Sequence, residues 1–271
     1  MSRRVIYTAL VGDYDEIVPI KAGINYDCFM FTDIALNKAP KNTGWTFLKI
    51  DSRKGKSKNL INRWYKMHPH LLFPNHKSSI YIDANVQIND FSEIESRILD
   101  LEKTGFNISI SDHIYRDCIY KEANAVVEFE KDTKKNVDDT VAVLKQDGYP
   151  EDNGLYENNF IFRHHHDPKV IALMHHWWDF INQYSCRDQL SLCYLLWKDG
   201  VESTYFFGQG NGVRNHKDIT FYSSHKVVRS DVIDKKIKFL CRIKLFLCKF
   251  IIGKGRRRHL RNKITGKSFR V

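Results

Sequence analysis

The residues best suited to chemistry form the segment Ser79-Ile80-Tyr81-Ile82-Asp83-Ala84-Asn85. A mainly apolar run ends there in an acid, a small residue and an amide. Apolar residues on both faces predict a strand buried in a parallel or mixed sheet, and such sheets bind ligands beyond the carboxyl ends of their strands. The oxygen atoms of Asp83 and Asn85 suit a hard divalent cation that bridges phosphate groups. A strand end followed by an Asx turn explains the same residues.

Apolar runs that each end in a polar loop recur along the chain, and helices with apolar residues at helical spacing separate the later ones. This alternation predicts an α/β fold on a mixed, mainly parallel sheet flanked by helices, within one domain over residues 1–229. One expected helix, over residues 57–72, carries Arg63 and Lys66 on one side. The expected strands span residues 4–11, 26–33, 44–51, 79–83, 106–111, 160–163 and 201–207. The other expected helices span residues 91–103, 123–146 (as two helices), 167–184 and 185–197.

The composition narrows the class of protein. With 42% hydrophobic residues the chain can bury a full core, and no run reaches the roughly 18 apolar residues of a membrane span. The N-terminus leads directly into a strand-like run. Together with six scattered cysteines that include no CxxC pair, this predicts reduced thiols in a cytoplasmic protein.

Positive charge is concentrated at the C-terminal end. Residues 235–271 contain 14 Lys or Arg and no Asp or Glu, and because the whole chain carries +11, the first 234 residues carry −3. The segment 230–271 is expected to form a basic amphipathic helix and tail that bind an anionic membrane surface, where each Lys or Arg contributes about 1 kcal/mol. An RNA-binding tail and a helix packed on the domain are the alternatives. Specific nucleic-acid recognition is not expected, since a nucleic-acid-binding domain would not concentrate its charge in this way.

An ordered set of motifs occupies the rest of the chain. The motifs are Asn62-Arg63-Trp64-Tyr65-Lys66-Met67-His68-Pro69, Tyr81-Ile82-Asp83, His113 with Arg116-Asp117-Cys118-Ile119-Tyr120-Lys121-Glu122, Gly148-Tyr149-Pro150, Gly154-Leu155-Tyr156-Glu157-Asn158-Asn159, Trp177-Trp178 and Arg187-Asp188-Gln189-Leu190-Ser191. In this order they resemble the bacterial and plant glycosyltransferase-like family once catalogued as domain of unknown function 616, and more distantly glycosyltransferase family 8. The resemblance covers roughly residues 4–210. It implies a GT-A-like, Rossmann-related fold and transfer of a sugar from a nucleotide-sugar donor such as a UDP-sugar.

A nucleotide-sugar transferase needs a pocket for the base. Asp13 and Tyr14 follow the first expected strand, and Thr32 and Asp33 end the second, so the four residues are expected to be neighbours in a sheet. The ring of Tyr14 suits stacking on a base, and the carboxylate of Asp33 suits accepting a hydrogen bond from it. Plain turns at the strand ends explain these residues about as well.

The enzyme must also neutralise the leaving diphosphate. Arg63 and Lys66 are expected to contact its oxygen atoms, since Arg suits bidentate phosphate geometry, although a solvated helix face is the alternative. Asp83 with Asn85 resembles the metal-binding Asp-x-Asp of GT-A enzymes. Here an amide replaces the second acid, and this replacement weakens the binding of Mn²⁺ or Mg²⁺.

The remaining metal ligand is expected to be a histidine. In family 8 a histidine late in the domain completes the metal site, and the resemblance implies His216 or His225 in that role. A metal-independent enzyme that relies on Arg63, Lys66 and Arg116 is the other possibility. Arg116 is also expected to pair with Glu122, either as a buried structural ion pair or as a group that contacts substrate.

Two acids are expected at the reacting sugar. The segment Arg187-Asp188-Gln189 resembles the Asp-Gln segment beside the anomeric carbon in family 8, which implies a catalytic Asp188 and a donor contact from Gln189. A helix cap explains Asp188 as well. Glu157, in a polar loop before a strand, is expected to act as general base toward the acceptor hydroxyl, as an inverting mechanism requires.

These features predict a GT-A-like hexosyltransferase. It would move a hexose from a nucleotide-sugar to a glycan or lipid-linked acceptor during assembly of capsule or lipopolysaccharide, at the cytoplasmic face of the inner membrane. The alternative is a non-catalytic glycan-binding or scaffolding protein on a degenerate transferase fold, which Asn85 favours. The choice between inverting and retaining chemistry does not follow from the sequence.

Overall fold

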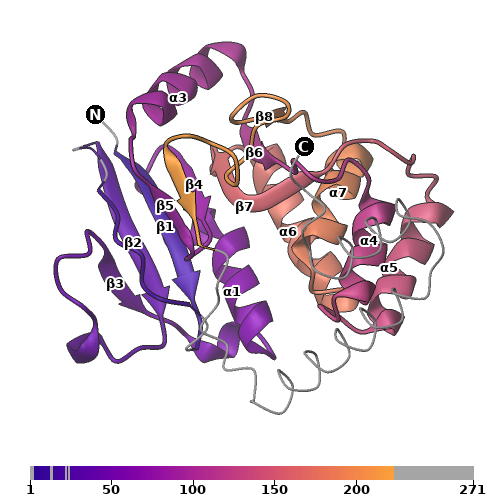
Figure 1. Cartoon of the computed structure of the whole chain (residues 1–271), viewed down its shortest axis with the longest axis horizontal. Helices are drawn as coiled ribbons and strands as arrows, with labels where there is room; N and C mark the ends of the chain where they lie inside the picture. The colour runs from indigo at the N-terminus through magenta and orange to yellow at the C-terminus, as the bar shows by residue number, and fades with distance from the viewer. Residues whose placement is uncertain (1–2, 13–14, 22, 24, 223–271) are drawn as a thin grey trace, which may run out of the picture. The chain divides into compact units, whose positions relative to one another are not determined.

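A seven-stranded sheet lies at the centre of the computed structural model, which describes residues 3–12, 15–21, 23 and 25–222 (Figure 1). In spatial order its strands are β3 (Thr46–Lys49), β2 (Tyr26–Thr32), β1 (Arg4–Leu10), β4 (Ser79–Ile82), β7 (Tyr156–Arg163), β6 (Ile108–Asp112) and β8 (Thr204–Tyr205). Only β7 runs antiparallel to its neighbours in this sheet. The predicted mixed, mainly parallel sheet is therefore confirmed. The carboxyl ends of the parallel strands meet at one edge, together with the first residues of β7.

Four helices cover one face of the sheet. They are α1 (Lys58–Met67), α2 (Pro69–Leu72), α6 (Pro168–Gln183) and α7 (Leu192–Asp199). Their apolar side chains, among them Ile61, Leu173 and Trp177, form one large core with Tyr7 of β1. The preceding residue of β1, Ile6, points into a core on the opposite face, as expected for a strand that is buried on both sides.

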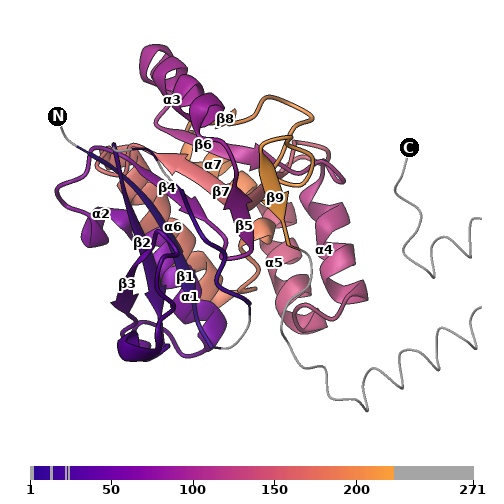
Figure 2. The ribbon, with the colours of Figure 1, turned by 60° about the vertical axis from the view of Figure 1, so that its left-hand side comes forward.

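The opposite face is covered by one helix and a small ribbon. Helix α3 (Ser92–Thr104) contributes Ile94 and Ile98 to that core, and the antiparallel ribbon of β5 (Val86–Ile88) and β9 (Ile219–Phe221) contributes Ile88. Figure 2 shows the two ribbon strands side by side. The ribbon begins only a few residues after β4, and its position therefore depends on the segment that contains Asp83.

The remaining helices are shorter or lie to one side. Helices α4 (Ile119–Glu128) and α5 (Lys134–Gln146) enclose a third cluster with Leu190, which lies in the 3-10 helix η3 (Asp188–Leu190). Two further 3-10 helices, η1 (Leu36–Lys38) and η2 (Ser52–Lys54), follow β2 and β3. The cluster around Leu190 therefore anchors η3, which carries Asp188.

Two helices differ from their predicted limits for local reasons. The helix expected over residues 57–72 begins where it was predicted, with Ser57 accepting a hydrogen bond from the amide of Leu60 (3.2 Å). It is interrupted at His68, because Pro69 has no amide hydrogen. The helix expected over residues 185–197 is divided into η3 and α7. The reason is Ser191, which has a non-helical backbone (φ −137°) and donates its hydroxyl to the carbonyl of Asp188 (3.2 Å).

The described residues belong to one compact unit, Met1–His225. None of the helices in this described part has both the length and the apolar character that crossing a bilayer requires. The basic helix predicted within residues 230–271 lies outside the described residues.

Candidate active site

Asp83 lies at the carboxyl end of β4, at the predicted edge of the sheet. Its amide still donates to the carbonyl of Asn159 on β7 (3.0 Å), so the backbone of Asp83 is held by the sheet while its side chain, 36% exposed, leaves it. The Lys66 ammonium lies 3.5 Å from Oδ1 of this carboxylate. The strand end and helix α1 are therefore joined at one point.

Lys66, Arg63 and Asp188 form a buried ion network next to Asp83. Lys66 Nζ donates to Asp188 Oδ2 at 2.6 Å, and Arg63 Nη2 lies 3.1 Å from Asp188 Oδ1. The side chains of Lys66 and Asp188 are only 1% and 4% exposed. Three segments far apart in the sequence, α1, the end of β4 and η3, thus bring their charged residues to one site.

A second set of polar contacts joins the C-terminal end of α1 to the sheet. The carbonyl of Lys66 accepts hydrogen bonds from Tyr7 Oη (2.9 Å) and from Arg163 Nη1 (2.8 Å), and Arg163 Nη2 also donates to Tyr7 Oη (2.5 Å). Arg163 is fully buried. Because residues of two strands hold the carbonyl of Lys66, the backbone from which its side chain extends is fixed in position.

The charges of the network shift the pKa of its members. Burial alone would raise the pKa of Asp188, but Arg63, Lys66 and Arg187 outweigh burial and hold that pKa far below its usual range. Burial lowers the pKa of Lys66, and the carboxylates of Asp188 and Asp83 counteract this. Asp188 is therefore ionised at neutral pH and is a very weak base.

Glu157 lies at the start of β7, at the same edge of the sheet. Its Oε1 forms an ion pair with Arg214, whose guanidinium stacks 3.9 Å from the ring centre of Phe221. Its other oxygen, Oε2, is buried and has no hydrogen-bond partner among the described residues. Burial raises the pKa of Glu157 and the nearby charge of Asp83 raises it further, whereas Arg214 and the side chain of Asn159 oppose them. Glu157 is thus a stronger base than Asp188.

The residues predicted to hold the base are placed only in part. Asp13 and Tyr14 lie outside the described residues. The two strand ends are neighbours as predicted, since Leu10 pairs with Thr32. Both carboxylate oxygens of Asp33 accept from the amide of Gly12 (2.9 Å), and Thr32 is fully buried with Oγ1 accepting from the amide of Ile34 (3.2 Å). In this structure both side chains therefore stabilise turns.

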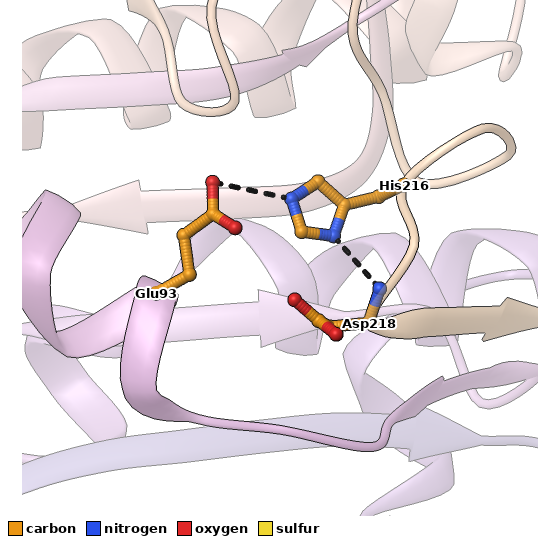
Figure 3. A group of neighbouring side chains, drawn as sticks. All are labelled: Glu93, His216 and Asp218. Carbon is orange, nitrogen blue, oxygen red and sulfur yellow. Dashed lines mark hydrogen bonds and ion pairs between the residues drawn. The ribbon is translucent and has the colours of Figure 1, made fainter.

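The predicted metal ligands are not brought together. Asn85 is 6% exposed and its Nδ2 donates to the carbonyl of Tyr222 (2.9 Å), at the end of the β5–β9 ribbon nearest Asp83. His216 lies at the other end, beside Glu93 and Asp218 (Figure 3). Asn85 and Asn89, whose amide donates to the carbonyl of Asp218, are four residues apart along the ribbon, a distance of about 13 Å. The alternative histidine, His225, lies outside the described residues.

Arg116 and Gln189 differ in how closely they are held. Arg116 forms an ion pair with Glu122, which is almost completely buried, and its amide donates to His113 Nδ1 (3.0 Å). The predicted pairing of Arg116 with Glu122 is therefore present, and the Arg116 side chain remains 27% exposed. Gln189 follows Asp188 directly in η3 and is half-buried.

Sequence reasoning assigned no role to three polar residues that lie at this edge. Arg187 acts on the pKa of Asp188, and its buried Nε has no hydrogen-bond partner among the described residues. Both side-chain amide atoms of Asn158 are likewise buried and without a partner in the described part of the chain. Arg187 and Asn158 belong to the motifs listed above, so the sequence contained a signal that could have identified them. Arg214 follows a glycine-rich loop, and no motif marks it.

Comparisons with known proteins give one family and several similar folds. Residues 34–227 match the family model described as TOD1/MUCI70, glycosyltransferase-like domain. No curated protein matches the chain significantly. Similar solved structures include the WbbM bifunctional glycosyltransferase (11% identity, 75% of this chain and 38% of that chain, TM-score 0.43). Another is the galactosyltransferase LgtC in complex with donor and acceptor sugar analogs (11% identity, 82% of this chain and 87% of that chain, TM-score 0.43). A third is mouse xyloside xylosyltransferase 1 (11% identity, 74% of this chain and 81% of that chain, TM-score 0.38).

Proposed function

The chain belongs to the TOD1/MUCI70 glycosyltransferase-like domain family, and on that premise we propose that it transfers a hexose from a nucleotide-sugar, a UDP-sugar in the first instance, to a glycan or lipid-linked acceptor. The observation that carries the proposal is the convergence of Arg63, Lys66, Asp83 and Asp188 at the carboxyl edge of the sheet. Ligands of α/β sheets bind at this edge.

The charge balance of the site supports a diphosphate ligand. The cations Arg63, Lys66 and Arg187 face the carboxylates of Asp83 and Asp188, which leaves one positive charge in excess. The Nε atoms of Arg63 and Arg187 are buried without hydrogen-bond partners in the described residues, so both guanidinium groups have a donor to offer. Phosphate oxygens accept such donors, and charge-assisted bonds of this kind are roughly twice as strong as neutral ones.

The two acids suit different roles in the transfer. Asp188 is neutralised by its partners and has a strongly lowered pKa, so we assign it to holding Lys66 and Arg63 and to contacting the donor sugar. Glu157 has a raised pKa and a free oxygen, so we assign it to accepting the proton of the acceptor hydroxyl. For that step its ion pair with Arg214 must loosen, because Arg214 otherwise stabilises the carboxylate and weakens it as a base.

A divalent ion fits this site only together with the donor. Asp83 is the one predicted ligand at this edge with a partly exposed side chain, since Asn85 is buried and His216 lies at the far end of the ribbon. One carboxylate plus phosphate oxygens is a set that Mg²⁺ accepts. Bound there, Mn²⁺ or Mg²⁺ would neutralise charge on the leaving diphosphate. Lys66, 3.5 Å from Asp83, already supplies one positive charge at the same place.

The location of the enzyme is part of the proposal. The 14 Lys and Arg of residues 235–271 support peripheral attachment to the cytoplasmic face of the inner membrane, where lipid-linked acceptors of surface polysaccharides are assembled. A non-catalytic glycan-binding or scaffolding protein is the second candidate. It is favoured by Asn85, an amide in place of a second acid, which the structure shows committed to Tyr222.

The experiment is a thermal-shift screen of the full chain with UDP-, GDP-, CMP- and dTDP-sugars, with and without Mn²⁺. A ligand at 100 times its Kd stabilises the folded state by about 2.7 kcal/mol, which raises the Tm of a protein of this size by roughly 5–11 °C. We expect one base to produce this shift in the wild type and in the exposed control Asp138→Ala, but not in Asp83→Ala. If no nucleotide-sugar changes the Tm, the proposal is wrong. Binding without release of nucleotide would favour the non-catalytic candidate.

A further inference from the structure

A second group of ionisable side chains lies between α3 and the β5–β9 ribbon, away from the sugar-transfer site. It consists of Glu93 from the first turn of α3, and of His216 and Asp218 from the segment that leads into β9. One ligand atom from each residue lies within 4.8 Å of the other two. Figure 3 shows the three side chains turned toward one another.

The protein backbone and packing hold these residues in place. The carbonyl of Asp218 accepts from the amide of Asn89 (2.8 Å), which extends the pairing of the ribbon. The ring of His216 packs against Phe207, with 4.6 Å between ring centres, and its side chain is only 9% exposed. The imidazole is therefore aimed at Glu93 by the fold and not only by attraction between the two.

The separation of the ligand atoms is informative. His216 Nε2 lies 3.5 Å from Glu93 Oε1, which is long for a direct hydrogen bond. In a tetrahedral site with metal–ligand bonds of 2.0–2.1 Å, neighbouring ligand atoms lie about 3.4 Å apart. The gap between imidazole and carboxylate thus has the size that an ion bound to both would require.

The local charge also calls for a cation. Glu93 and Asp218 bring two carboxylates together, and each has one cationic partner on an exposed side chain. Arg97 Nη2 lies 3.9 Å from Glu93, and Lys217 Nζ lies 3.7 Å from Asp218. Their side chains are 43% and 79% exposed, so water screens much of their effect.

We propose that Glu93, His216 and Asp218 bind a first-row divalent ion, best represented by Zn²⁺, that fastens the β5–β9 ribbon to α3. One imidazole nitrogen and two carboxylates suit Zn²⁺, whereas Mg²⁺ and Ca²⁺ prefer oxygen ligands alone. The site is independent of the sugar-transfer proposal, because it lies at the end of the ribbon remote from Asp83.

Binding has a specific local cost. His216 Nδ1 accepts a long hydrogen bond from the amide of Asp218 (3.3 Å), so the ring hydrogen lies on Nε2 in the metal-free chain. An ion at Nε2 requires the other tautomer, with the hydrogen on Nδ1, and the contact with the Asp218 amide must open. We therefore expect weaker binding than at a site already in the metal-binding tautomer, accompanied by a change in the environment of residues 216–218.

The test is titration of the EDTA-dialysed full chain with ZnCl₂ by calorimetry, and with CoCl₂ by visible absorption, which reports tetrahedral coordination. The wild type, the histidine control His176→Ala and Asp83→Ala should each bind one equivalent more than His216→Ala, or bind it at least about tenfold more tightly. Should His216→Ala fail to fold, Glu93→Gln must show the same loss. Equal stoichiometry and affinity in the wild type and in these site variants would overturn the proposal, and would leave the sugar-transfer proposal untouched.

Discussion

The ion pair between Lys66 and Asp188 gives a quantitative prediction. The two charges are 2.6 Å apart on side chains that are 1% and 4% exposed. Removing one member of such a buried pair leaves an uncompensated charge and costs about 3–5 kcal/mol of unfolding free energy. Here Arg63 still faces Asp188 in Lys66→Met, and Asp83 still faces Lys66 in Asp188→Asn, so we expect the lower limit, about 3 kcal/mol, for each variant.

The assay is a double-mutant cycle measured by urea unfolding of the full chain. Because the second substitution removes the charge that lost its main partner in the first, Lys66→Met/Asp188→Asn should cost little more than either single variant. The coupling free energy should then be about 2–3 kcal/mol, and each single variant should lower the Tm by roughly 6–12 °C. The matched control is the exposed helical pair Lys135–Asp139, whose coupling should be about 0.3–0.5 kcal/mol. A coupling at Lys66–Asp188 no larger than in this control would refute the buried network.

Two further predictions concern protons. Glu157→Gln should lower turnover about 10²–10⁴-fold, with donor binding retained. In the wild type burial raises the pKa of Glu157, so the kcat should begin to fall at a higher pH than it would with an ordinary Glu, which a kcat–pH profile would show. His68 and His165 are buried, and burial lowers their pKa to about 4 and about 3 in the fold. Below pH ~6.5 the unfolded chain therefore binds more protons than the folded chain. The free energy of unfolding should fall between pH ~6.5 and pH ~4, by up to about 2.7 kcal/mol per pH unit for the two histidines together.

These two predictions have clear contrary outcomes. A Glu157→Gln enzyme with wild-type turnover would remove Glu157 as the base. A pH-independent stability between pH 6.5 and 4 would contradict the burial of the two histidines. His176→Ala, which changes a histidine with a 38% exposed side chain, serves as the control in that experiment.

The layered fold and part of the site could be predicted from local sequence. Apolar runs that end in polar residues identified β1, β2 and β4 within about one residue of their limits. The register of neighbouring strands then follows from sheet geometry, and so does the proximity of Thr32 to the end of β1. Helical spacing predicted that Arg63 and Lys66 lie on one side of a helix. It did not predict their contact with Asp188, because Lys66 and Asp188 are more than 120 positions apart in the sequence.

The features that were missed depend on tertiary contacts. Asn85 and His216 were predicted to share a metal, yet the register of β5 with β9 separates them along the ribbon, and no local pattern encodes that register. The division of the predicted helix 185–197 depends on the hydroxyl of Ser191, which also accepts from Trp177 Nε1 (2.9 Å) in another helix. Arg214 reaches Glu157 from a loop that carries no motif.

Release of nucleotide from a nucleotide-sugar donor, measured for the wild type, Asp83→Ala and the exposed control Asp138→Ala, tests most directly whether this edge of the sheet transfers sugar. We predict turnover in the wild type and in Asp138→Ala, and a loss of at least about 100-fold in Asp83→Ala with an unchanged far-UV spectrum and Tm. Turnover of Asp83→Ala at the wild-type rate would contradict the assignment.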